Sequence, residues 1–512
     1  MDDLNLGMFR ANDIRTPARR LTDELALRLA QAEACYIRNS MGARGVVIAH
    51  DARASGPRLT EIALSAYAQA GLDCVLLPGV TGVCQFYYAC MRHADLAGVF
   101  VGASHNPAGD TGRKIVGPGV TPIAADLGPE GGLTRLAELY KVGASDRSDT
   151  PGRISAFDAL PGYVAYSVRH AQVEPGGLRR VRILHDYLNA AGGRELMLGF
   201  APSGAQLVPL HAVANPMFPL GDPNPVKQDV IAHGLQTLRA GDFDLGMFFD
   251  GDADRLDVYL GDGTLLSSSF VYAAILPFIL RRMYNPKYHD LSPTAGVVTD
   301  ASPIVYTDTK SNPLAIAEMA AAGVEPRIIR SGHSHIKHAM YGDPRAIGTV
   351  EESAHYYEAF TYEGHRYCTE NTLYFALMVA RAWRDDPDRF RHLARVQASS
   401  GREREWGHVF PDDAFRSQAL AAVREHFAAL GAQVTDRMAD GTPMQSDFIR
   451  YGIPSGAPPS GDWLQISQRV SQSEDHLARW EVMAGSQALA SETKAAIQRI
   501  VKPFGAGPEY QG

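Results

Sequence analysis

The chain has 512 residues, of which 45% are hydrophobic and 21% charged, a composition typical of a globular protein large enough for three or four domains. With a net charge of −8 at pH 7, the chain gives no sign of the basic surface that nucleic-acid binding needs. Its five scattered cysteines indicate neither a disulfide framework nor a zinc site. No apolar run reaches the ~20 residues of a membrane span and no basic-apolar leader follows Met1, so we expect a soluble, cytoplasmic protein.

Helices and short apolar strands alternate through the first part of the chain. The hydrophobic periodicity predicts a helix, a strand, a helix and two strands, in that order, over residues 21–40, 46–48, 58–70, 74–77 and 97–101. Such alternation is typical of parallel α/β layers. A stretch rich in Gly, Pro, Ser and Asp, at about 142–162, predicts a loop at the end of this first domain.

Three further units follow this loop. Their predicted strands lie at 181–184, 245–249, 295–298, 326–329, 463–466 and 478–482, and their predicted helices lie near 371–384, 414–430 and 491–501. The last unit mixes helices and strands without βαβ alternation, so its predicted class is α+β. We therefore expect domains at 1–160, 161–270, 271–396 and 397–512.

Three aspartates follow the apolar run 245–249, in the segment Asp250-Gly251-Asp252-Ala253-Asp254-Arg255. Open α/β sheets place their ligands beyond the carboxyl ends of strands, and three oxygen donors suit a small divalent cation. A solvated acidic turn is the alternative interpretation. An EF-hand is excluded because Arg255 occupies the position where that loop needs glycine.

A serine lies in a loop of small residues after the strand at 97–101, in the segment Gly102-Ala103-Ser104-His105-Asn106-Pro107. Glycines at 102, 109 and 112 would let another molecule approach the backbone. The Ser104 hydroxyl could act as a nucleophile and carry a phosphate, and Lys114 could supply positive charge beside that phosphate. An Asn-Pro turn with a capping serine stays open as the alternative. Wrong glycine spacing excludes both a P-loop and a nucleophile elbow.

Two other segments carry weaker signals. Arg10 and Arg15 flank a turn-like Asn-Asp pair, and the planar guanidinium suits bidentate phosphate contact, although a surface basic turn would look the same. Glu351 and Ser353 could together hold vicinal sugar hydroxyls, with a solvated loop as the alternative. Three nearby histidines lack a zinc-ligand pattern.

Taken together, these four segments resemble the motifs of the α-D-phosphohexomutase superfamily, particularly its bacterial phosphomannomutase/phosphoglucomutase branch. The resemblance implies three similar mixed α/β domains plus a smaller C-terminal α+β domain around a central cleft. It implies that Ser104 is a phosphoserine, with Arg15, Lys114 and His105 as further catalytic residues. It also implies that Mg²⁺ is bound by Asp250, Asp252, Asp254 and the phosphorylated Ser104.

The resemblance implies sugar-phosphate contacts from several parts of the chain. The implied substrate-binding residues are Arg10, Arg255, His333, Glu351, Ser353, Arg469, Ser471, Ser473 and Arg479. The segment from Arg469 to Asp475 is similar to the family's R-x-S-x-T-E-P phosphate loop, but Asp475 replaces the proline. An acid beside a bound phosphate should weaken its binding.

The implied activity is that of an isomerase that interconverts hexose 6-phosphate and hexose 1-phosphate, of mannose or glucose, through a hexose 1,6-bisphosphate. No nucleic-acid or membrane partner is expected, and the sequence leaves the oligomeric state open. Three alternatives also stay open: a phosphoglucosamine mutase, a relative that forms a sugar bisphosphate, and a noncatalytic homologue that binds sugar phosphates.

Overall fold

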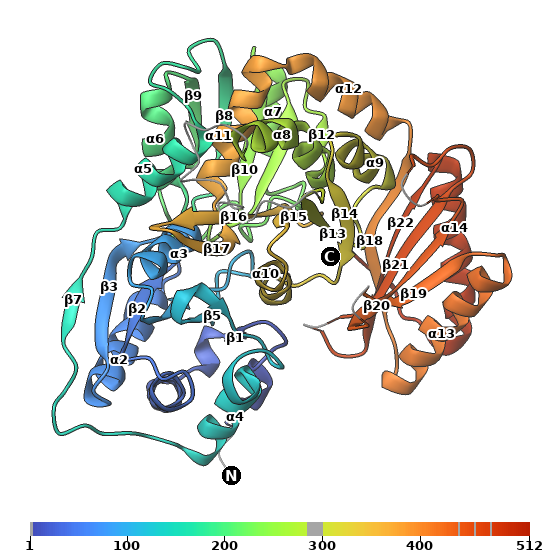
Figure 1. Ribbon diagram of the computed structural model, residues 1–512. Helices are drawn as coiled ribbons and strands as arrows, with labels where there is room; N and C mark the ends of the chain where they lie inside the picture. The colour runs from blue at the N-terminus through green and yellow to red at the C-terminus, as the bar shows by residue number, and fades with distance from the viewer. Residues whose placement is uncertain (1–3, 284–300, 439–440, 455–456, 472–473, 512) are drawn as a thin grey trace.

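The computed structural model describes residues 4–283, 301–438, 441–454, 457–471 and 474–511, which form four β-sheets in chain order with helices packed on them (Figure 1). The strand expected at 295–298 and the predicted site residue Ser473 lie outside the described residues. None of the described helices is long and apolar enough to cross a membrane. All five cysteines are free and buried.

The first sheet has the strand order β1-β5-β4-β2-β3-β7, with β6 beside β5. Its strands are β1 (Ile14–Pro17), β2 (Gly45–His50), β3 (Asp73–Val80), β4 (Ala97–Val101), β5 (Asp110–Gly117), β6 (Thr121–Pro122) and β7 (Ile154–Ala156). Its helices are α1 (Asp23–Cys35), α2 (Gly56–Gln69), α3 (Val83–Arg92) and α4 (Leu133–Val142). The stretch 142–162, expected to be a loop, contributes β7 because its backbone pairs with the edge of β3.

The second and third sheets have the orders β12-β11-β10-β8-β9 and β14-β13-β15-β16-β17. The second contains β8 (Arg182–Asp186), β9 (Gln206–Leu210), β10 (Leu245–Phe249), β11 (Leu256–Leu260) and β12 (Leu265–Leu266), with helices α5 (Leu160–Ala171), α6 (Gly193–Phe200) and α7 (Ala232–Ala240). The third contains β13 (Ile304–Asp308), β14 (Glu325–Ile329), β15 (Ala346–Glu351), β16 (His355–Tyr362) and β17 (His365–Glu370), with helices α8 (Ser268–Met283), α9 (Pro313–Ala321), α10 (His333–Gly342), α11 (Thr372–Asp385) and α12 (Pro387–Ala398).

These three sheets share one topology, which confirms the expected similarity of the first three domains. In each sheet a central strand (β2, β8 or β13) lies parallel to two neighbours, β3 and β4, β9 and β10, or β14 and β15. The next strand along the chain (β5, β11 or β16) then runs antiparallel beside β4, β10 or β15, respectively. The sheets are therefore mixed rather than wholly parallel, because a chain that reverses through a short turn pairs antiparallel.

The shared topology gives three turns an equivalent position. Residues 102–109 join β4 to β5, residues 250–255 join β10 to β11, and residues 352–354 join β15 to β16. Each turn follows the carboxyl end of a parallel strand, where ligands of open α/β sheets bind. The serine loop, the aspartate turn and the Glu351 segment are thus the same structural element in three successive sheets.

The fourth sheet is antiparallel throughout its described pairs and has the order β19-β20-β21-β22-β18-β23. Its elements are β18 (Gly401–Val409), α13 (Asp413–Ala429), β19 (Gln433–Arg437), β20 (Pro443–Tyr451), β21 (Leu464–Val470), β22 (Leu477–Ala484), α14 (Gln487–Val501) and β23 (Glu509–Gln511). Figure 1 shows α13 and α14 together along this sheet. This arrangement confirms the predicted α+β class.

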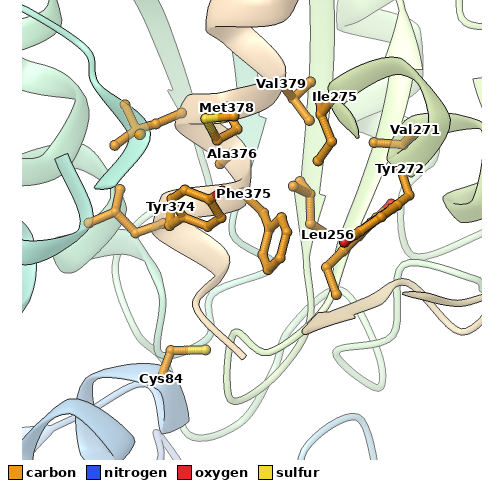
Figure 2. Packing of buried hydrophobic residues seen from close by; sticks show 14 of the residues in the cluster. Cys84, Leu256, Val271, Tyr272, Ile275, Tyr374, Phe375, Ala376, Met378 and Val379 are labelled. Carbon is orange, nitrogen blue, oxygen red and sulfur yellow. The ribbon is translucent and has the colours of Figure 1, made fainter. Parts of the chain in front are cut away.

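The first three sheets share one large hydrophobic cluster, whereas the fourth has its own. In the shared cluster α8 packs against α11, with Val271, Tyr272 and Ile275 facing Phe375 and Val379 (Figure 2). Common burial of apolar surface opposes relative movement of the first three domains. The described residues of the fourth domain take no part in this shared cluster.

A buried ion pair ties these core helices to the third sheet. Arg282 at the end of α8 contacts Glu358 on β16, and both side chains are fully buried. The Tyr374 hydroxyl of α11 donates to Glu358 Oε2 at 2.5 Å and accepts from Arg282 Nη1 at 2.8 Å. Three elements therefore meet at one charge pair.

We expect Glu358→Gln to destabilise the protein by about 3 kcal/mol, because it leaves the Arg282 guanidinium buried without its counter-charge. Glu363→Gln is the matched control, since that carboxylate pairs with Arg92 at the surface and should contribute at most ~1 kcal/mol. Urea unfolding followed by circular dichroism gives both values. Equal midpoints for the two variants would contradict a structural role for the buried pair.

Candidate active site

Ser104 lies in the turn between β4 and β5 with its backbone in the left-handed region, at φ 47°. Its hydroxyl donates to Asp250 Oδ2 at 2.8 Å and lies 3.1 Å from His105 Nδ1. Arg15, on β1, contacts the Ala103 carbonyl and donates to Asn106 Oδ1 at 3.1 Å. The predicted serine loop, aspartate turn and Arg15 are therefore in contact.

The glycines of this loop have a different role from the one expected. A Cβ atom at Gly102 would lie 2.7 Å from Asp51 Oδ2, and one at Gly112 would lie 2.0 Å from the Ile14 carbonyl oxygen. These two positions are small because neighbouring parts of the same chain pack on them, not because they admit another molecule. At Gly109 no atom lies within 4 Å of such a Cβ.

Asp250, Asp252 and Asp254 converge after β10 and are all buried. One carboxylate oxygen of each lies within 4.8 Å of the others. Lys114 Nζ donates to Asp252 Oδ2 at 2.8 Å and to Asp254 Oδ2 at 2.6 Å. The Lys114 ammonium thus neutralises two of the aspartates, a contact that the sequence did not predict for it.

Electrostatic shifts at the aspartates reflect burial and close charges. Burial raises the pKa of Asp250 to about 7, and the Asp254 and Asp252 carboxylates add to this rise. Burial would also raise the pKa of Asp254, but Lys114 and then His355 outweigh it and hold that pKa well below its usual value. Burial opposes the charge on Lys114, yet Asp252 and Asp254 raise its pKa. The centre therefore binds positive charge strongly.

The histidines around the centre differ in the direction of their pKa shifts. Burial lowers the pKa of His105 well below its usual value, and Arg255 and Arg15 lower it further. His333, at the first residue of α10, is likewise shifted down by burial and by Lys337, so its pKa also favours the neutral form. His355 Nε2 donates to Asp254 Oδ1 at 3.1 Å, and this carboxylate raises the pKa of His355 against the effect of burial.

The Glu351 segment lies beside the aspartate turn. Arg255 forms a backbone bridge with His355, and its Nε lies 3.8 Å from Asp250 Oδ2. Ser353 Oγ lies 3.0 Å from His355 Nδ1. Glu351 accepts from the Gly332 N–H at 3.2 Å. The structure therefore brings the predicted residues of the second and third domains together.

The predicted phosphate-binding residues of the fourth domain form their own group. Arg469 and Arg479 face each other across β21 and β22, and both contact Glu405 of β18, at 3.0 Å and 2.9 Å. Arg479 Nη2 also lies 3.0 Å from Glu474 Oε1, and Ser471 donates to the same carboxylate. Burial would raise the pKa of Glu405, but Arg469, Lys310 and Arg479 hold it far below its usual value. The carboxylates that pair with Arg469 and Arg479 are thus those of Glu405 and Glu474.

Arg10 lies apart from the serine loop. It lines a cavity of about 130 Å³ between the first and fourth domains together with Ser471, Glu474 and Asp475. Its Nε atom is buried and has no hydrogen-bond partner among the described residues. Arg10 therefore faces the predicted phosphate loop.

Sequence reasoning missed the residues that brace the serine loop from behind. Arg53 donates to the Ser104 and Asn106 carbonyls at 2.8 and 2.6 Å, and Asp51 Oδ2 accepts from the Ala103 N–H at 3.1 Å. Asp51 and Arg53 also pair with each other at 3.1 Å while almost fully buried. The signal was present, because both follow directly after the buried strand β2, as the aspartates follow β10.

This arrangement combines a nucleophile with a compact set of oxygen donors. A hydroxyl held against three carboxylates, with an ammonium and two guanidinium groups close by, can carry a group with anionic oxygens. The buried Asp252 Oδ1 has no hydrogen-bond partner among the described residues, so it offers a lone pair to a cation. The donor set therefore fits a divalent metal ion with oxygen ligands.

Comparison with known proteins gives consistent matches. Residues 7–128 match the family model described as "Phosphoglucomutase/phosphomannomutase, alpha/beta/alpha domain I", and residues 161–263 match domain II of the same family. A phosphomannomutase of Vibrio cholerae is 24% identical over 70% of this chain and 73% of the relative. A phosphoglucomutase of Neisseria gonorrhoeae is 28% identical over 66% and 68%. The crystal structure of a phosphoglucomutase/phosphomannomutase family protein from Burkholderia thailandensis, 20% identical, superposes with a TM-score of 0.78 over 98% of this chain and 99% of that one.

Gly251 permits the contact between the serine loop and the aspartate turn, because a Cβ there would lie 2.1 Å from the Ser104 carbonyl oxygen. We expect Gly251→Ala to push the two turns apart and to lower sugar-phosphate turnover by about 100-fold, since displacements near 1 Å have costs of that order. Gly109→Ala, in open space, is the control and should keep full turnover. Steady-state kinetics of both variants gives the comparison; normal rates in Gly251→Ala would mean that the contact is not needed.

Proposed function

This chain belongs to the α-D-phosphohexomutase superfamily, and we propose that it is an isomerase that moves a phosphoryl group between the two ends of a hexose monophosphate through Ser104. One observation carries the assignment of the centre: the Ser104 hydroxyl donates to Asp250 Oδ2 at 2.8 Å, within a cluster of three buried aspartates. A hydroxyl in that position can hold a phosphoryl group next to a carboxylate-bound cation.

In the proposed reaction, Ser104 begins as a phosphoserine. A hydroxyl oxygen of the hexose monophosphate attacks the phosphorus as the bond to Ser104 Oγ breaks, which gives a hexose 1,6-bisphosphate. The bisphosphate then turns over, and Ser104 Oγ attacks the phosphorus at the other end as its bond to the sugar oxygen breaks, which regenerates the phosphoserine and releases the isomeric hexose monophosphate. Because phosphoryl transfer needs in-line positioning and charge stabilisation, Arg15 and Lys114 would stabilise the phosphoryl oxygens.

We further propose that Asp250, Asp252 and Asp254, together with an oxygen of the phosphorylated Ser104, hold Mg²⁺. The unpartnered Asp252 Oδ1 and the compact oxygen set support this choice. Bound Mg²⁺ would neutralise charge on the transferring group. His105, whose pKa is lowered by burial, would stay uncharged beside Ser104 and leave the positive charge to the arginines and the metal.

Substrate positioning falls to the other domains in this proposal. Glu351 and Ser353 would bind sugar hydroxyls, with His333 and Arg255 alongside them, and their closeness to the aspartate turn supports this role. Arg469, Ser471, Ser473 and Arg479 would hold the phosphate that is not being transferred. Arg10 lines a cavity together with Ser471, which supports a role for Arg10 beside this loop. Gripping the distal phosphate positions the reacting end.

The favoured substrates are mannose and glucose phosphates, because relatives named for both sugars match the chain. An activity assay across substrates distinguishes this function from a phosphoglucosamine mutase and from an enzyme that forms a sugar bisphosphate. A noncatalytic sugar-phosphate-binding role is disfavoured, since the Ser104–Asp250 contact and the bridging Lys114 are intact.

The test of this function is a coupled assay with mannose, glucose and glucosamine 1-phosphates in the presence of Mg²⁺ and a trace of hexose 1,6-bisphosphate. We expect turnover of at least one substrate, reversible loss of activity in EDTA, and loss of activity in Ser104→Ala because the phosphoryl acceptor is gone. Peptide mass spectrometry of active enzyme should find phosphate at Ser104. Activity that survives in Ser104→Ala would exclude the phosphoserine mechanism.

The Glu405 carboxylate should compete with substrate phosphate for Arg469 and Arg479. We expect Glu405→Gln to lower KM by up to about tenfold, since removal of a like charge favours an anion, while Arg469→Ala raises KM. Glu403→Gln is the control on the same strand, because Glu403 contacts Gln487 and Ser491 instead. A higher KM in Glu405→Gln would show instead that Glu405 is needed to orient the two arginines.

A further inference from the structure

The first three domains each bury one aspartate at the same place, at the end of the central strand. These residues are Asp51 after β2, Asp186 at the end of β8 and Asp308 at the end of β13. In each, the Oδ1 atom accepts a hydrogen bond from the backbone N–H two residues further on, at 3.0, 3.1 and 3.2 Å respectively. The shared turn geometry makes the three positions equivalent.

The residue that donates this hydrogen bond differs in the second domain. It is Arg53 in the first domain and Lys310 in the third, so each of those aspartates has a cation on its own turn. Arg53 pairs with Asp51 at 3.1 Å. Burial raises the pKa of Asp308 to about 7, and the Lys310 ammonium opposes part of that rise. In the second domain the residue is Leu188, which carries no charge. A fully buried carboxylate without a compensating cation is strongly unfavourable.

Two histidines from other elements lie where the missing cation is needed. His211, directly after β9, has its Nδ1 atom 2.8 Å from Asp186 Oδ1. His211 Nε2 lies 3.2 Å from Nδ1 of His233, which is exposed on the first turn of α7. Asp186 Oδ2 is buried and accepts no hydrogen bond within the described part of the chain. His211 Nδ1–H is therefore the side-chain donor to this carboxylate, and a neutral imidazole brings no counter-charge of its own.

We propose that His211 Nε2 and His233 Nδ1 bind a divalent transition-metal ion of the Zn²⁺ class, separate from the Asp250 cluster. Asp186 accepts the Nδ1 proton of His211, which sets the tautomer that leaves Nε2 free as a ligand, the arrangement common for metal-bound histidines. Ligand bonds of about 2.0–2.1 Å place two ligand atoms of one zinc ion about 3 Å apart, which matches the 3.2 Å separation. Water completes the coordination, and the ion supplies the charge that Leu188 does not.

This ion braces the active centre from a distance. The loop from His211 runs to Phe218, whose ring lies 5.3 Å from the guanidinium carbon of Arg53, and on to Pro223, which packs against Gly251. Arg53 holds the Ser104 carbonyl, and Gly251 lies in the aspartate turn. Fixing His211 to α7 therefore fixes the start of a loop that supports both halves of the reaction centre.

The test is calorimetric titration of EDTA-treated full-length protein with Zn²⁺ in excess Mg²⁺, so that the carboxylate cluster is saturated. We expect a zinc site in the wild type that weakens at least about tenfold in His233→Ala, while His365→Ala, which removes another exposed histidine, binds as the wild type does. His211→Asn, chosen because asparagine tolerates the left-handed backbone at φ 47°, should weaken it as much. Asp186→Asn should weaken it by about 10–100-fold, as for other metal-orienting carboxylates.

A second readout uses Cu²⁺ in place of Zn²⁺, because electron paramagnetic resonance detects nitrogen ligands directly. Two coupled nitrogens are expected in the wild type and in His365→Ala, and fewer in His233→Ala. Equal zinc affinity and equal nitrogen coupling in the wild type and His233→Ala would overturn the proposal. That result would leave Asp186, His211 and His233 as a hydrogen-bonded chain with a proton in place of the metal.

Discussion

Three carboxylates are buried at one turn, and most of the candidate site is arranged around their charge. Asp250, Asp252 and Asp254 cannot remain ionised in a buried site without compensating groups. The compensation comes from other elements: Lys114 from β5, the Ser104 hydroxyl from the preceding turn, and His355 from β16. Because these partners belong to different domains, the same charges that prepare the site also hold the domains in register.

The repeated topology explains why the partners meet. In each of the first three sheets the last of three parallel strands (β4, β10 or β15) ends in a short turn, and the next strand runs antiparallel to it. The residues proposed for the chemistry lie on or beside these turns. A common hydrophobic cluster then holds the three sheets together, so that the equivalent turns approach one another. The same repetition exposes the exception at Asp186, where the turn has Leu188 in place of the Arg53 or Lys310 of its counterparts.

The fourth domain is attached differently. It has its own core, and polar contacts to the third domain come from Arg402 to Glu352 at 2.9 Å and from Gln465 to the Ser311 carbonyl at 2.9 Å. Arg469 and Arg479 are paired with carboxylates of the same domain, so binding an anion there requires an exchange of partners. A domain with a separate core and exchangeable ion pairs would suit the proposed reaction, in which the bisphosphate turns over between the two transfers.

The sequence by itself predicted several of the buried strands and the polar turns that follow two of them. The apolar runs that became β4 and β10, and the polar segments directly after them, are local patterns, and local patterns survive without knowledge of the neighbours. The glycine roles, the pairing of Lys114 with two aspartates, the bracing by Arg53 and the carboxylate of Glu405 on Arg469 were decided only by the tertiary structure. Each of these depends on which distant residue comes within a few ångströms, and burial then turns that proximity into a charge or packing requirement that no spacing along the chain encodes.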